Sequence, residues 1–232
     1  MISWVIACAT ARERGLSPLT IAIAVVLALV ACFSSSADAW AGLTFEVLTL
    51  LVGAGLLADE LESGHAQLVL LRPLTRAQWL GGRLAGAALV IGSAALLATL
   101  AGAQAAIFRG LGSETPQRLA VLPLTLLPAF AWLATVVALS AVARGWTNAG
   151  IVIAVYFGWK VAKFSLPLAL HRLDLQPLFE GLDRYFGPQE LISLPAGTSL
   201  IERAAWDALW FFAAWTCAVR LFNLRELARR RP

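Results

Sequence analysis

The stretch LAGAALVIGSAALLATLAGAQAAI, residues 84–107, contains no charged side chain. An α-helix rises about 1.5 Å per residue, so about 20 apolar residues cross a hydrocarbon core about 30 Å thick. The stretch exceeds this length. It predicts a helix that spans a membrane.

The whole chain shares the apolar character of this stretch. Of its 232 residues, 59% are hydrophobic and only 14% are charged, and the mean hydropathy is +0.77. Backbone N–H and C=O groups must be satisfied inside a lipid-exposed segment, and no run alternates like a barrel strand. We therefore expect an all-α, polytopic membrane protein with one domain over residues 1–232.

Six apolar runs are long enough to be spans. An even number of spans places both termini on the same side of the membrane. The predicted spans cover residues 17–36, 40–58, 84–107, 119–143, 147–169 and 204–222.

The distribution of Lys and Arg predicts on which side of the membrane the termini lie. Cytoplasmic loops carry an excess of Lys and Arg, so the richer side is the cytoplasm. The net charge of +4 gathers at membrane borders, which does not indicate nucleic-acid binding. Both termini are predicted to be cytoplasmic, because eleven of the 18 cations fall on their side: Arg12, Arg14, Arg72, Arg76, Arg83, Arg144, Arg220, Arg225, Arg229, Arg230 and Arg231.

Two segments outside the spans also have helical character. Residues 1–15 are an apolar segment that ends in Arg12-Glu13-Arg14, which suits a helix in the cytoplasmic interface. Residues 171–203 form a longer external loop whose apolar side chains recur at three- and four-residue spacing up to Gly187-Pro188. This pattern indicates either an amphipathic helix on the outer leaflet or a lid packed on the spans.

The N-terminal region also resembles a secretory signal with an A-x-A cleavage site at Ala37-Asp38-Ala39. The apolar run from Leu16 to Phe33 is longer than the usual core of such a signal. Cleavage would also leave five spans, so we interpret the run as the first span.

The sequence lacks the motifs of a membrane-embedded enzyme. It contains no H-E-x-x-H, no G-x-S-x-G and no G-x-x-x-x-G-K-[ST]. The predicted topology puts His65 and His171 on opposite sides of the membrane, and the three cysteines form no C-x-x-C pair. We expect neither catalysis nor a metal site in this chain.

Lys160 and Lys163 are unusual because they fall inside the fifth span. Counting about 1.5 Å per residue from its start places Lys160 near the bilayer midplane and Lys163 about one turn further out. A lysine facing lipid there costs about 2.5 to 3.5 kcal/mol on insertion scales. The pair either lines a translocation path or extends to the outer interface, helped by a bend at Pro167.

A charged insert precedes the opening stretch. LLADELESGHAQLVLLRPLTRAQWLGGRLAG, residues 56–86, lies on the cytoplasmic side in the predicted topology. Its polar part, residues 59–83, encloses the apolar run Leu68 to Leu71. A partner protein recognises such a segment through apolar anchors and through charges that fix register. We favour a docking helix over a solvated loop.

This insert resembles a segment of the permease subunits of type-2 ABC exporters. The shared order is acid-x-acid-x-Gly, a leucine-rich turn, Pro-x-x-Arg, and an apolar residue before Gly-[Lys/Arg]. Here it reads Glu60-Leu61-Glu62-Ser63-Gly64, Leu68 to Leu71, Pro73-Leu74-Thr75-Arg76 and Leu80-Gly81-Gly82-Arg83. His65-Ala66-Gln67 departs from the Thr-Leu pair that is common in the family, and Arg83 replaces a common Lys.

The resemblance implies a partner and a site. In that family the segment after the second span is a coupling helix, which sits in a cleft of a separate cytoplasmic ATPase. It also implies a second permease subunit, ATP and Mg bound by the partner rather than by this chain, and a bacterial-type inner membrane. Pro73 and Arg76 would set the turn into the third span. The ATPase contacts would be Asp59, Glu60, Glu62, Gly64, His65, Leu68 and Leu71.

Two other classes of function compete with a permease. An ion-driven secondary transporter needs a carboxylate or a broken helix near the midplane. The carboxylate that we place inside a span is Glu46, about a turn and a half into the second one. A membrane-embedded enzyme is the weakest alternative, and the transported substrate cannot be read from the sequence.

Overall fold

The computed structural model describes residues 3–33, 43–57, 74–143, 147–169, 176–183, 187–188 and 199–229. In these ranges every regular element is a helix, which confirms the all-α prediction. The elements are α1 (Trp4–Gly15), α2 (Pro18–Phe33), α3 (Leu43–Gly53), α6 (Arg76–Phe108), the 3-10 turn η1 (Gly112–Glu114), α7 (Thr115–Ser140), α8 (Thr147–Ala169), α9 (Gln176–Asp183) and α10 (Leu200–Arg229).

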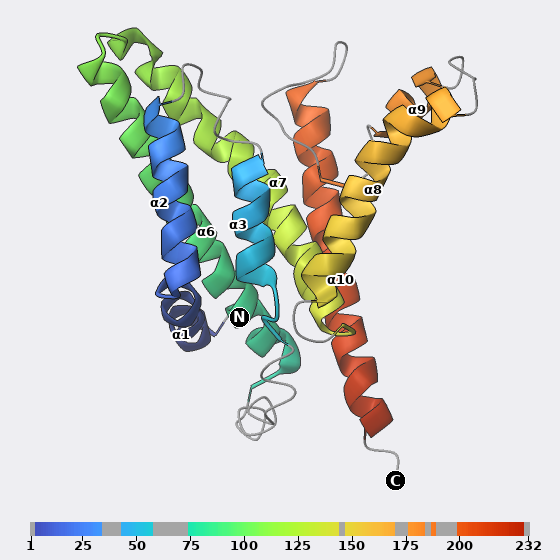
Figure 1. Cartoon of the computed structure of the whole chain (residues 1–232). Coiled ribbons are helices and arrows are strands. Elements are labelled where there is room, and N and C mark those ends of the chain that lie inside the picture. The colour runs from blue at the N-terminus through green and yellow to red at the C-terminus, as the bar shows by residue number, and fades with distance from the viewer. Residues whose placement is uncertain are drawn as a thin grey trace.

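The long helices run side by side and alternate in direction (Figure 1), and both ends of the chain lie toward the same end of the bundle. Among the described residues, Arg76–Phe108 and Leu122–Ser140 are long and apolar enough to cross a membrane. The pair α1 and α2, bent by 76°, passes the same test as one unit. Two helices, or three with the bent pair, therefore meet the requirement for a membrane span.

Helix α6 is the centre of the fold, because α1, α2 and α7 all pack against it. Its surface is rich in Ala and Gly, so neighbouring backbones approach closely: a Cβ added at Gly102 would lie 3.1 Å from the carbonyl oxygen of Ala31 on α2. Helices α10 and α3 also pack against α7. The buried core lies among these helices and includes Leu27, Leu48, Leu80, Ile91 and Leu133.

The start of α6 differs from the predicted start of the third span. The helix begins at Arg76, eight residues before Leu84, so residues 76–83, which the sequence placed in the polar insert, form the first turns of α6. Thr75 caps this start, because its hydroxyl accepts from the Gln78 N–H while the Gln78 side chain accepts from the Thr75 N–H. The side chain of Arg83, which the sequence placed at the border of the third span, is buried against α1.

Helix α1 confirms the expected N-terminal helix and turns sharply into α2 (Figure 1). Its apolar residues occupy two faces. Ala7 and Thr10 are buried toward α6, whereas Trp4 and Val5 are exposed. This division explains why the sequence shows no single apolar face.

Helix α9 lies within the region where the external amphipathic helix was expected. It packs against α8, where Phe179 contacts Trp159 with ring centroids 6.1 Å apart. Leu178 and Leu182 stay exposed. The choice between an amphipathic helix on the outer leaflet and a lid packed on the spans therefore stays a prediction.

Candidate functional site

The predicted docking segment lies largely outside the described residues. Asp59, Glu60, Glu62, Gly64, His65, Leu68, Leu71 and Pro73 all fall in residues 58–73. The structure describes the two points where this segment joins the helices, and it describes Arg76. These two attachment points form the candidate site.

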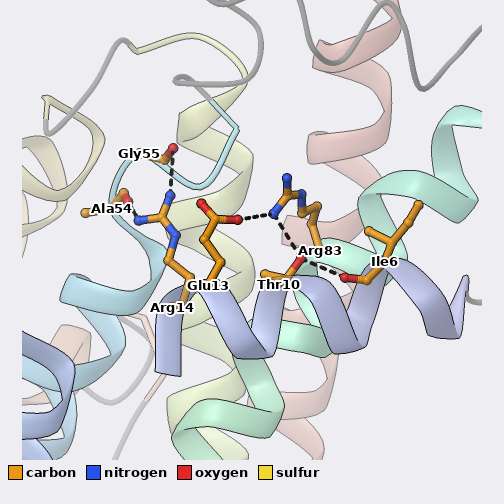
Figure 2. Close-up of polar contacts among 7 residues, drawn as sticks. All are labelled: Ile6, Thr10, Glu13, Arg14, Ala54, Gly55 and Arg83. Atoms are coloured by element: carbon orange, nitrogen blue, oxygen red, sulfur yellow. Dashed lines mark hydrogen bonds and ion pairs between the residues drawn. The ribbon is translucent and has the colours of Figure 1, made fainter. Parts of the chain in front are cut away.

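The first attachment point is the turn Ala54–Leu57 that follows α3. All four of its residues are buried, and Gly55 has a φ of 63°, a conformation that favours glycine. Arg14 at the end of α1 holds the turn, because its Nη1 and Nη2 donate to the carbonyl oxygens of Ala54 at 3.0 Å and of Gly55 at 3.2 Å (Figure 2). The N-terminal helix is thereby hydrogen-bonded to the backbone that leads into the segment.

Asn148, near the start of α8, supports the same turn from another side. Its side chain is fully buried, and its Oδ1 accepts from the Gly55 N–H at 3.5 Å. Its Nδ2 donates to the Gly53 carbonyl at 3.4 Å, to the Val136 carbonyl at 3.3 Å and to the Ser140 hydroxyl. One amide thus connects α3, α7 and α8.

We expect Asn148→Leu to destabilise the protein. The change leaves the buried Gly55 N–H without its side-chain acceptor, at about 1 to 3 kcal/mol for an unsatisfied group, while the Ser140 hydroxyl keeps its bond to the Val136 carbonyl. Thermal unfolding in detergent measures the loss. Gln104→Leu is the matched control, because it removes a side-chain amide from an exposed position of α6, and a melting temperature as low as that of Asn148→Leu would contradict this role.

The second attachment point is the first turn of α6. Besides the Thr75 cap, Arg76 Nη1 donates to Asn223 Oδ1 on α10 at 3.2 Å. Trp79 stacks on Phe222 of α10, with ring centroids 5.3 Å apart. Residues 58–73 are therefore followed by a helix whose first turn contacts α10.

Arg83 joins α1 to α6 close to both attachment points. Its Nη1 donates to Thr10 Oγ1 and to Glu13 Oε2, each at 3.0 Å, while Thr10 donates to the Ile6 carbonyl (Figure 2). The Arg83 side chain is 11% exposed and that of Glu13 is 57% exposed. A buried guanidinium is tolerated here because it has a carboxylate and a hydroxyl as partners.

These contacts give α1 two polar connections on adjacent residues. Glu13 binds α6 and Arg14 binds the turn after α3, and Figure 2 shows Glu13 between the two arginines. Helix α1 is thus bonded both to the turn that precedes residues 58–73 and to α6, the helix that follows them.

The two lysines of the fifth predicted span lie on α8. Lys163 is half-buried, and the side chain of Lys160 lies outside the described residues. The choice between a translocation path and an interfacial position therefore stays a prediction.

Sequence reasoning missed several polar residues that the fold buries. Asn148 and Arg14 hydrogen-bond to the turn after α3. Arg203 and Asp207 of α10 are 3% and 0% exposed. Asp207 lies inside the predicted span 204–222, so Glu46 is not the one carboxylate within a span, and that interpretation was wrong. The position of Asp207 within an apolar run was the sequence signal that could have identified this buried carboxylate.

Comparison with the models of known protein families and with curated proteins finds no match for this chain.

Proposed function

We propose that this chain is the membrane-spanning permease subunit of an ATP-driven type-2 ABC exporter. Residues 59–76 would form the coupling segment, docked on a separate cytoplasmic ATPase. The observation that supports the proposal most is the double attachment of this segment. Its entry is held by Arg14 and Asn148, and its exit continues into α6.

The contacts suit a part that receives force. ATP-driven closure of a partner would push on the segment, and the push would reach the bundle through the turn Ala54–Leu57 and through the start of α6. Buried, hydrogen-bonded ends transmit a displacement, whereas loosely held ends would absorb it. Helix α1 would keep the two ends in register.

The proposal includes the remaining expectations about the assembly. Six spans would cross a bacterial-type inner membrane with both termini in the cytoplasm, and α1 would lie in the cytoplasmic interface. A second permease subunit, identical or similar, would complete the pathway. ATP and Mg would be bound by the ATPase, which agrees with a chain that carries no P-loop.

Co-purification tests the proposal. We expect the tagged chain, extracted from its native membrane in mild detergent, to retain a P-loop ATPase whose ATP hydrolysis increases several-fold over that of the isolated ATPase. The matched control is an unrelated six-span protein prepared in the same way. Failure to recover any ATPase, from membranes where both subunits are expressed, would overturn the assignment.

An ion-driven secondary transporter is the second candidate, and Asp207 is the observation that favours it. Its carboxylate is fully buried in a helix of the bundle, where ionisable groups commonly mark ion pathways. The two candidates differ in energy source. Transport by the chain alone in vesicles, driven by a proton or sodium gradient without ATP and lost in Asp207→Asn, would favour this second class.

A further inference from the structure

A groove runs over α7 between α6 and α10, and its volume is about 360 Å³. Every residue that lines it is apolar. Phe130 of α7 contributes to its floor, and α6 and α10 form its walls through Gly81, Ala85, Ala88, Phe212 and Trp215. The groove thus has the apolar lining of a small-molecule site and lies at the low end of the size range of such sites, about 300 to 1,000 Å³.

The two walls meet next to the groove. Trp79 stacks on Phe222, and Arg76 Nη1 donates to Asn223 Oδ1. Arg76 precedes Gly81 by five residues, which corresponds to about 7.5 Å along the helix axis. The cationic side chain of Arg76 therefore belongs to a residue just beyond one end of the apolar groove.

We propose that this groove holds one acyl chain of a phospholipid, and that Arg76 binds the phosphate of the same lipid. A guanidinium has five N–H donors in a planar fork, and one Nη of Arg76 donates to Asn223, which leaves donors for phosphate oxygens. Arg76 is only half-buried, so a headgroup can reach it. The inference rests on the membrane placement in the proposed function, but it is independent of coupling to an ATPase.

The cation near the groove favours a phospholipid over a helix of a second copy, because a phosphate gives Arg76 an anionic partner. The groove extends about 10.5 Å along α6, from Gly81 to Ala88, which accommodates part of one hydrocarbon chain. A single hydrocarbon chain is narrow enough to enter. The lining offers apolar contact to the part of the chain that lies in the groove, whereas a polar ligand would lose its hydration without compensation.

The position of the groove gives the bound lipid a consequence. One wall is α6, which begins directly after segment 58–73, and the other is α10, to which the start of α6 is bonded. An acyl chain in the groove would separate α6 from α10 on the groove side of the Trp79–Phe222 stack. The lipid would then set the distance between α6 and α10.

Native mass spectrometry of the full chain tests the proposal. The protein is purified in detergent with added 1-palmitoyl-2-oleoyl phosphatidylglycerol, and the fraction that retains one lipid is measured. Ala88→Trp fills the groove, and we expect it to lower that fraction about tenfold, since the indole replaces contacts of the acyl chain. Arg76→Gln removes the cation and is expected to lower the fraction several-fold.

Leu89→Trp is the matched control, because Leu89 is the next residue on α6, is 42% exposed and does not line the groove. It is expected to retain lipid like the unmodified chain. Equal retention in Ala88→Trp and Leu89→Trp would overturn the proposal. A shift from dimer to monomer in Ala88→Trp with unchanged lipid would also overturn it, because a second copy would then cover the groove. Unfolding of Ala88→Trp is detected by its elution profile, and Ala85→Phe then repeats the test.

Discussion

We expect Leu68→Asp to abolish the ATP hydrolysis that this chain would stimulate in the proposed ATPase partner, and we expect Glu60→Arg to do the same. A carboxylate at Leu68 would have to be buried without a partner in the ATPase cleft, and an arginine at Glu60 would reverse the charge that fixes register. Removing a central apolar anchor costs about 2 kcal/mol or more in many interfaces. The measurement is the ATPase rate of the reconstituted complex against the isolated ATPase.

Leu224→Asp is the matched control for this prediction. It makes the same change at a residue of α10 that is 62% exposed and lies outside segment 58–73. We expect it to leave stimulated hydrolysis within about twofold, as surface substitutions usually have small effects. Equal ATPase rates in Leu68→Asp and in the unmodified complex, with normal membrane insertion, would refute the docking assignment while leaving the helical fold unaffected.

Gly86→Leu is expected to detach α1 from α6. A Cβ at Gly86 would lie 2.5 Å from the Ala7 carbonyl oxygen and 2.5 Å from Thr10 Cβ, and a Cβ at Gly82 would lie 2.8 Å from Ile6 Cβ. A side chain at Gly86 therefore has no space unless α1 moves. Overpacking of this kind costs about 1 to 3 kcal/mol or more, and it would also break the bonds of Arg83 to Thr10 and Glu13. Thermal unfolding and trypsin cleavage after Arg12 measure the two effects.

Gly92→Leu provides the comparison within the same helix, because a Cβ added there has no atom of a neighbouring helix within 4 Å among the described residues. It is expected to keep the melting temperature of the unmodified chain and its resistance to trypsin, and leucine is the better helix former by about 0.5 to 1 kcal/mol. Similar melting temperatures for the two variants would show that α1 does not depend on the close approach at Gly86.

The apolar runs of the sequence predicted most helices of the fold. The predicted spans 119–143 and 147–169 correspond closely to α7 and α8, and 17–36 to α2. This worked because the length of an apolar run is a local property, and a segment that cannot pair its backbone with lipid has few alternatives to a helix. Charge was less reliable as a boundary signal: α6 begins at Arg76, although the predicted span began after the charged Arg83.

The sequence could not predict the partners of the buried polar groups. Arg83 lies within an apolar helix because Glu13 and Thr10 lie across from it, and Arg14 reaches the Ala54 and Gly55 carbonyls 40 residues further along the chain. Asn148 bonds to Gly53, 95 positions away. Such contacts depend on how helices cross, and composition carries no information about crossing geometry.

The sequence by itself determined that this chain forms apolar helices with a charged segment after the second, because both features follow from local hydrophobicity and charge. Only the tertiary structure decided what that segment is attached to. The crossing of α1 over Gly82 and Gly86 brings Glu13 to Arg83 and Arg14 to the turn after α3. The physical reason is that a backbone carbonyl such as that of Ala54 becomes a partner only when folding brings a donor within hydrogen-bonding distance.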